Sequence, residues 1–207
     1  MKMTTKSGNL LPCNSFFNFF TFLIGFRCYS NCTKFLAVDV DFDDPKLFLK
    51  FVRQQSKLGF TNAEIPLFLF DHMKLIRPLP DIVDFNQLLS SICKIKPNPP
   101  FSTVISLYRD LLFLGLRPNN YSLNILANCY CRLGYVHFGL SLVSYTIKLG
   151  YQPDIATFNT LINGFIHSNQ LDKAVPLLDK ILKLGYQPTL ITYGSMFKGL
   201  CRSGDNA

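Results

Sequence analysis

The chain repeats a short phrase at a fixed interval. Three glycines stand 35 residues apart, and so do three prolines: Gly115, Gly150, Gly185, Pro118, Pro153 and Pro188. Each glycine and proline close a similar phrase, such as Leu-Gly-Tyr-Gln-Pro-Asp at 149–154. A period on the order of 20–50 residues indicates a solenoid, in which one supersecondary unit stacks on the next. We therefore expect an extended binding surface and no single deep pocket.

Within a unit, the apolar pattern is that of two helices. In the third unit, apolar residues recur at the i, i+3, i+4, i+7 spacing over 155–167, and a second amphipathic run covers 171–184. Gly185 then stands where the end of a helix favours a left-handed residue, and Pro188 prevents continuation. Each unit is therefore predicted to be a helical hairpin that covers its apolar faces by stacking.

The alignment divides the chain into seven segments. These are 1–29, a mitochondrial transit peptide; 30–61, a linker and a degenerate helix; 62–81, a partial repeat; 82–119, 120–154 and 155–189, three complete repeats; and 190–207, a truncated fourth repeat. The first complete repeat has 38 residues, and we expect its excess, 96–100, to widen the loop between its helices. Pro176 is expected to kink its helix or delay its start. We read the chain as a truncated member or a fragment.

Composition supports a folded basic protein. Hydrophobic residues make up 48% of the chain, which is ample for a buried core. The net charge of +8 fits a polyanionic partner or an anionic membrane surface. The alternative is a basic organelle protein without a specific polyanion.

The seven cysteines do not resemble a disulfide framework, because their number is odd and their spacing wide. Cys93, Cys131 and Cys201 occupy the twelfth place of their units, and the third unit has Ile166 there. A place that accepts Cys or Ile indicates apolar packing on a helix. We expect no metal site.

The first 38 residues resemble an organelle transit peptide, because no acidic residue precedes Asp39. The sequence Arg-Cys-Tyr-Ser at 27–30 also resembles a mitochondrial cleavage site. The alternative is a secretory signal peptide, since 16–26 is an apolar run, although it is shorter than the roughly 20 residues that span a bilayer. We expect a mitochondrial location, with a plastid as the alternative, and no membrane insertion.

These repeats resemble the pentatricopeptide repeat family of plant organelle proteins. Residues 155–164 read Ile-Ala-Thr-Phe-Asn-Thr-Leu-Ile-Asn-Gly, and 198–204 read Lys-Gly-Leu-Cys-Arg-Ser-Gly, both close to the family pattern. The match covers roughly 62–207, and 83–89 resembles the P-type, restorer-of-fertility-like branch. The resemblance implies an all-α, right-handed α-solenoid of stacked 35-residue helix-turn-helix repeats. Tetratricopeptide proteins are the structural alternative, but their period is about 34 and their typical Trp is absent.

The resemblance also implies binding of single-stranded RNA, with one base read per repeat. In the family, the fifth and last residues of a unit face the base. Here those pairs are Asn86 with Asn119, Asn124 with Asp154, and Asn159 with Thr189. An Asn amide offers both a donor and an acceptor to a base edge. By the family code, Asn–Asp reads uridine, Asn–Asn a pyrimidine, and Asn–Thr loosely a pyrimidine, while Gly194 leaves the fourth unit without a reading side chain. The alternative role for the three fifth-place Asn residues is a helix N-cap.

Two further rows recur in phase. The second places, which pack against bases in the family, hold Val83, Tyr121, Ala156 and Ile191. The thirteenth places hold Lys94, Arg132, His167 and Arg202. A row of cations along one edge is suited to a phosphate backbone. The alternative is a solvated edge that keeps the solenoid soluble.

The sequence has no motif for catalysis, since H-E-x-x-H, G-x-S-x-G and phosphate-loop patterns are all missing. We therefore expect an organelle RNA-binding protein without intrinsic catalysis or cofactor. Its partner would be a single-stranded organelle transcript, together with possible protein partners in an RNA-processing complex. The alternative is a tetratricopeptide-like scaffold that binds a peptide on its concave face.

Overall fold

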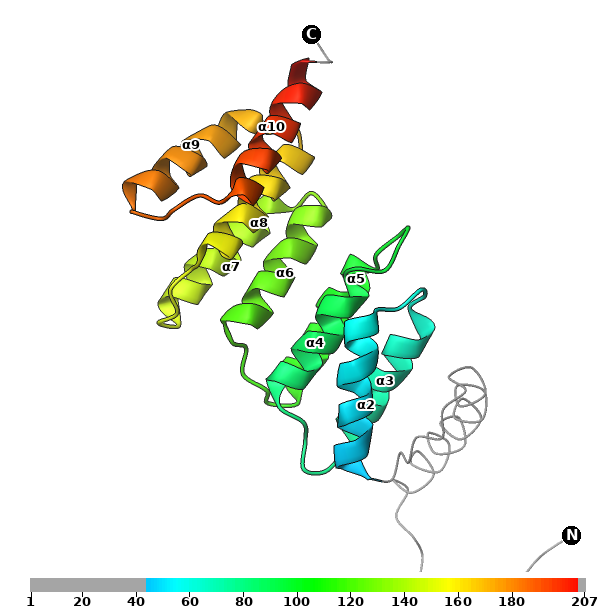
Figure 1. Ribbon diagram of the computed structural model, residues 1–207. Coiled ribbons are helices and arrows are strands. Elements are labelled where there is room, and N and C mark those ends of the chain that lie inside the picture. The colour runs from blue at the N-terminus through cyan, green and yellow to red at the C-terminus, as the bar shows by residue number, and fades with distance from the viewer. Residues whose placement is uncertain (1–43, 205–207) are drawn as a thin grey trace, which may run out of the picture. The chain divides into compact units, whose positions relative to one another are not determined.

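A computed structural model describes residues 44–204, and every regular element within that range is an α-helix (Figure 1). The helices are α2 (Pro45–Leu58), α3 (Glu64–Leu75), α4 (Ile82–Ile92), α5 (Phe101–Phe113), α6 (Asn120–Arg132), α7 (Val136–Lys148), α8 (Ile155–His167), α9 (Leu171–Lys183) and α10 (Leu190–Gly204). The predicted transit peptide lies outside the described residues. Among the helices described, none combines the length and the apolar character needed to cross a membrane.

The helices stack as a solenoid. The chain divides into two compact parts, 1–48 and 49–207, and the repeats lie in the second. There the first helix of each repeat contacts the first helix of the next, α4 on α6, α6 on α8 and α8 on α10 (Figure 1). The second helices α5, α7 and α9 each pack against the first helix that follows. The predicted all-α solenoid is confirmed, and its right-handed sense stays a prediction.

The 35-residue period marks the end of each second helix. Gly115, Gly150 and Gly185 have φ angles of 81°, 83° and 81°. At Gly150, the backbone N–H donates to Ile147 O, and the N–H of Tyr151 donates to Thr146 O. This is the Schellman arrangement, which satisfies the last carbonyls of a helix and requires a left-handed residue. The recurring glycine therefore ends the helix, as predicted.

The proline-rich segment 96–100 and the single Pro176 behave differently. The excess of the first complete repeat falls within 96–100, between α4 and α5, so it lengthens the inter-helix loop as expected. In contrast, α9 begins at Leu171 and continues through the exposed Pro176, so this proline does not delay the helix.

Small residues let the first helices approach closely. The twelfth-place residue of one repeat faces the tenth-place residue of the next. A Cβ atom built on Gly164 would lie 2.6 Å from the Sγ of Cys131 and 2.7 Å from its Cβ, and one on Gly199 would lie 3.0 Å from Ile166. Packing at the twelfth place is confirmed for Cys131 and Ile166, which are buried in the core. Cys201, in contrast, is exposed.

Candidate nucleic-acid interface

The last residue of each repeat begins the next first helix. Asn119 and Asp154 are the N-caps of α6 and α8, and each forms a capping box with the residue three positions on. The Oδ1 atom of Asp154 accepts the backbone N–H of Thr157 at 2.8 Å. The Oδ1 atom of Asn119 accepts the N–H of Ser122 at 2.9 Å. The N–H groups at the start of a helix have no partner within the helix, so they bond to the side chains of the last-place residues. These hydrogen bonds hold the last-place residues at the junction between repeats.

The fifth-place Asn residues lie inside α4, α6 and α8, away from the helix starts. The N-cap of α4 is Asp81, and those of α6 and α8 are last-place residues. The alternative that the fifth-place asparagines act as N-caps is therefore wrong. Their side chains instead cross to the following repeat.

A hydroxyl joins each predicted pair. The Nδ2 group of Asn86 donates to Asn119 Oδ1 at 3.1 Å and to Ser122 Oγ at 3.0 Å. In the next repeat, Thr157 Oγ1 lies 2.8 Å from both Asn124 Oδ1 and Asp154 Oδ1. The tertiary fold thus brings together residues that stand 30 or more positions apart.

The third pair follows the same plan. Thr192 Oγ1 lies 2.7 Å from Asn159 Oδ1 and 3.3 Å from Thr189 Oγ1. The three connecting hydroxyls, on Ser122, Thr157 and Thr192, are at most 1% exposed. The sequence analysis missed them, although they recur at the third place of their repeats.

The pairs differ in accessibility. Asn86 is 1% exposed, and its Oδ1 atom is buried without a hydrogen-bond partner. Asn124 and Asn159 are partly buried, whereas Asp154 and Thr189 are exposed. A base can therefore approach the second and third pairs directly, while contact with Asn86 requires neighbouring side chains to move.

The second-place residues offer apolar surface to solvent. Val83, Tyr121 and Ile191 are 46%, 52% and 69% exposed, and Ala156 is exposed as well. The hydroxyl of Tyr121 donates to Ser90 Oγ at 3.2 Å, so this ring reaches from α6 to α4. Exposed flat or branched side chains of this kind are suited to packing against bases.

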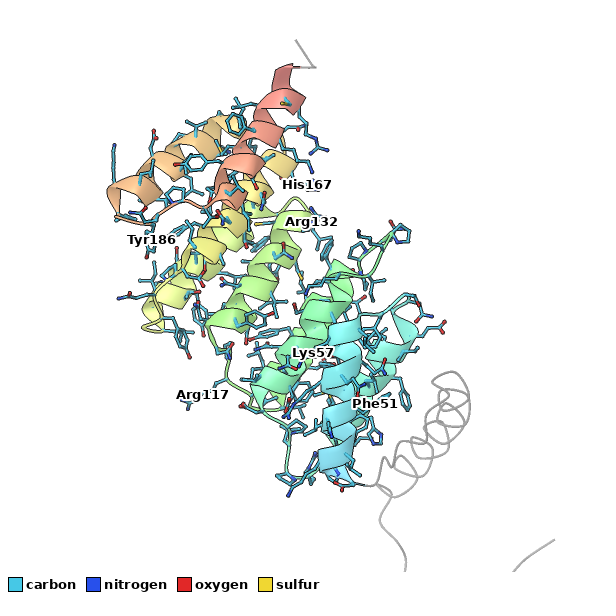
Figure 2. The ribbon with its side chains drawn as sticks, viewed as in Figure 1. Phe51, Lys57, Arg117, Arg132, His167 and Tyr186 are labelled. Carbon is cyan, nitrogen blue, oxygen red and sulfur yellow. The ribbon has the colours of Figure 1, made fainter. Side chains whose placement is uncertain are left out.

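Three of the four predicted thirteenth-place cations line one groove of about 320 Å³ on α6, α8 and α10. They are Arg132, His167 and Arg202 (Arg132 and His167 are labelled in Figure 2). Lys198, which was not predicted, joins them from the ninth place of its repeat. Among the described residues that line the groove, the side chains that carry a full charge at neutral pH are the cations Arg132, Lys198 and Arg202. Lys94 is exposed but does not line it.

The junction before the first complete repeat is built differently. Its third-place residue is Asp84, which is 5% exposed, in place of a hydroxyl. The guanidinium of Arg53 donates to both carboxylate oxygens, at 2.6 and 3.0 Å. This hydrogen bond and the attraction to the carboxylate raise the pKa of Arg53. An ion pair thus replaces the hydroxyl-linked Asn pair at this junction.

Comparisons with known proteins point to one family. Residues 153–202 match the model of the PPR repeat family, and 121–151 match that of the PPR repeat. The chain is 39% identical over 90 residues to the mitochondrial pentatricopeptide repeat-containing protein At5g16640 of Arabidopsis thaliana, covering 44% of this chain and 17% of that protein. It is 48% identical over 63 residues to At1g62680, also mitochondrial and from Arabidopsis, covering 30% of this chain and 11% of that protein. The chain thus spans only a small part of these relatives.

Two solved structures share the fold. The pentatricopeptide repeat protein PPR10, in complex with an 18-nt psaJ RNA element, superposes with a TM-score of 0.61 at 22% identity, covering 73% of this chain and 22% of that chain. The PPR domain of Arabidopsis protein-only RNase P 1, in complex with tRNA, has a TM-score of 0.61 at 16% identity, covering 78% of this chain and 81% of that chain. At these identities the likeness concerns the fold alone.

Proposed function

We propose that this chain is a pentatricopeptide repeat protein, on the match of residues 121–151 and 153–202 to the models of that repeat family, and that it binds single-stranded RNA sequence-selectively, one base per repeat. The observation that carries the proposal is the recurring junction. At each one, an Asn amide and the last-place residue of the repeat meet through a buried hydroxyl. A groove lined by cations lies on the same helices α6, α8 and α10.

Base selection is assigned to the partly open pairs. Asn124 with Asp154 is proposed to read uridine, and Asn159 with Thr189 to read a pyrimidine. Hydrogen bonds hold the side-chain amides of Asn124 and Asn159, so each amide presents a donor or an acceptor at a fixed position. Their orientational freedom is therefore already lost before RNA binds. Asn86 with Asn119 is proposed to read a pyrimidine once the neighbouring side chains that bury Asn86 move.

The second-place and thirteenth-place residues are proposed to hold the RNA strand. The second-place residues Val83, Tyr121, Ala156 and Ile191 would pack against bases. The thirteenth-place cations Lys94, Arg132, His167 and Arg202 would neutralise phosphates. The guanidinium of Arg132 also lies 5.8 Å from the ring centroid of Phe101, which helps to hold it at the groove.

The cellular role is proposed from the relatives. The two relatives described above are named as mitochondrial proteins, so we place this chain in mitochondrial RNA metabolism, with a plastid as the alternative. We assign it to the P-type, restorer-of-fertility-like branch. It would act by occupying a transcript segment, alone or with protein partners, and without catalysis of its own.

RNA titration at several salt concentrations tests the proposal. We expect weak binding that falls steeply with salt, because stacking contributes about 1–3 kcal/mol per base and only three complete repeats are present. Replacing Arg132 by Ala should weaken all sequences alike and lower the slope by about 0.7 per phosphate lost. Replacing Asn124 by Thr should instead shift one position towards guanine, as the family code implies for Thr–Asp.

Two results would contradict the proposal. An absence of RNA binding at low salt would favour the peptide-binding scaffold. If the Asn124→Thr substitution changed affinity but not base preference, Asn124 would be structural and the register of the reading pairs would be wrong.

A further inference from the structure

We propose that the buried hydroxyl at the third place of each repeat decides which atom of the preceding reading Asn faces the base. The inference rests on the proposed function, which assigns the fifth-place Asn to base reading. It makes Ser122, Thr157 and Thr192 positioning residues that transmit the identity of the last-place residue to the reading amide.

At the first junction, the donor and the acceptor of each hydrogen bond can be assigned. Asn119 Oδ1 accepts the backbone N–H of Ser122, so the atom at that point is an acceptor. Asn86 therefore turns its Nδ2 group inward, where it donates to Asn119 Oδ1 and Ser122 Oγ. The Ser122 hydroxyl gives its proton to Asn119 Oδ1 at 2.9 Å. The carbonyl oxygen of Asn86 is left on the other side of the amide, where it is buried without a hydrogen-bond partner.

At the second junction, one proton faces two oxygens. Thr157 Oγ1 accepts the N–H of Asp154 at 3.3 Å and lies 2.8 Å from both Asp154 Oδ1 and Asn124 Oδ1. A hydroxyl has one proton, and a bond to a carboxylate is the stronger choice. Turning the Asn124 amide by 180° exchanges its oxygen and nitrogen, so that Nδ2 donates to Thr157 Oγ1. Every contact is then a hydrogen bond, and the Asn124 carbonyl faces outward.

The third junction has no competing carboxylate. Thr192 Oγ1 accepts the N–H of Thr189 at 3.0 Å and can accept the Thr189 hydroxyl at 3.3 Å. Its own proton therefore remains for Asn159 Oδ1 at 2.7 Å. The carbonyl of Asn159 faces inward, and its NH₂ group faces outward.

The two orientations favour different pyrimidines. The N3 position of uracil is a donor, whereas that of cytosine is an acceptor. An outward carbonyl on Asn124 therefore selects uracil, and an outward amide on Asn159 selects cytosine. An Asn at the fifth place therefore reads different bases in the two repeats. The reason is that an acidic last-place residue and a hydroxyl last-place residue direct the proton of the buried hydroxyl differently.

Replacing Thr157 tests the relay in the 207-residue chain. Two RNAs that differ by uracil or cytosine at the Asn124 position are titrated at low salt. We expect the Thr157→Val substitution, which removes the hydroxyl, to reduce the uracil-over-cytosine affinity ratio about fivefold to tenfold, the equivalent of one hydrogen bond. Thr157→Ser should retain it. Thr146→Val is the matched control, since Thr146 is a buried threonine whose hydroxyl bonds Leu142 O outside the relay.

Equal ratios for wild type and Thr157→Val would overturn the proposal, as would an equal loss in Thr146→Val. A second measurement needs no RNA. In the free protein, the side-chain amide protons of Asn124 should show a nuclear Overhauser effect to Thr157, whereas those of Asn159 should show none to Thr192. The same pattern at both asparagines would refute the relay. Failure to bind RNA, with the two asparagines still different, would refute the proposed function alone.

Discussion

Replacing Gly164 by Ala probes the packing that aligns the repeats. The added methyl group would lie 2.6 Å from Cys131 Sγ, 2.7 Å from its Cβ and 3.5 Å from its Cα. Non-bonded carbon atoms prefer about 3.5–4.0 Å, so α6 and α8 must separate by several tenths of an ångström. A change of side-chain rotamer cannot relieve this clash, because Cβ is fixed to the backbone.

The expected magnitude follows from two opposing terms. Overpacking of a core costs about 1–3 kcal/mol, and the gain in helix propensity from Gly to Ala returns about 1 kcal/mol. Because the added Cβ atom would clash with the Cβ atom of Cys131, which cannot move away by a rotamer change, we place the overpacking cost near the upper end of this range. We therefore expect Gly164→Ala to lower the free energy of unfolding by about 1–2 kcal/mol. Gly194 in α10 is the matched control, since a Cβ there meets nothing within 4 Å. Gly194→Ala should raise stability by about 0.5–1 kcal/mol.

Urea unfolding followed by circular dichroism compares the two variants. A double mutant adds a sharper test. The nearest atom to an added Cβ at Gly139 is Cys131 Sγ, at 2.9 Å. Cys131→Ala should therefore rescue Gly139→Ala in part, but it should not rescue Gly164→Ala, because the Cβ of residue 131 remains. If Gly164→Ala stabilised the protein as much as Gly194→Ala, the close approach of α6 and α8 would be wrong.

Three further outcomes are expected. Arg53→Met should lower the free energy of unfolding in urea by about 1–2 kcal/mol, because it leaves the buried carboxylate of Asp84 unpaired. The loss is limited because the Arg53 side chain is half exposed, so solvent screens its charge. Adding Asp84→Ser should recover part of this loss, and no recovery would contradict the reasoning. Burial raises the pKa of Cys131 to about 11, so alkylation at pH 8, followed by peptide mass spectrometry, should modify it only in urea; rapid native labelling would show that it is not buried. Diamide, which takes up the two thiol hydrogens, should link Cys93 to Cys129, whose Sγ atoms lie 3.5 Å apart; an intact pair of thiols after treatment would show that the helices cannot close to the roughly 2.05 Å of a disulfide.

The helices and their order were predictable because their signals are local. The left-handed glycine after α9 and the apolar spacing over α8 act within a few residues along the chain. The fifth-place position of Asn124 and Asn159 could also be located by counting from the repeat boundary. In contrast, Pro176 was expected to kink its helix or delay its start, and the delay was wrong, since α9 begins at Leu171 and includes Pro176 at an exposed position.

The sequence by itself determined the period, the helical hairpins, and which side chains recur in phase. Only the tertiary structure decided that Asn86 is buried while Asn124 is partly open, that Lys198 joins Arg132 in one groove, and that Thr157 connects a reading pair. The contact between Thr157 and Asn124 joins residues 33 positions apart, and Lys198 and Arg132 stand further apart still, so no local propensity specifies these arrangements. They follow from how closely the helices stack, and that distance is set by small residues at the contacts between neighbouring repeats.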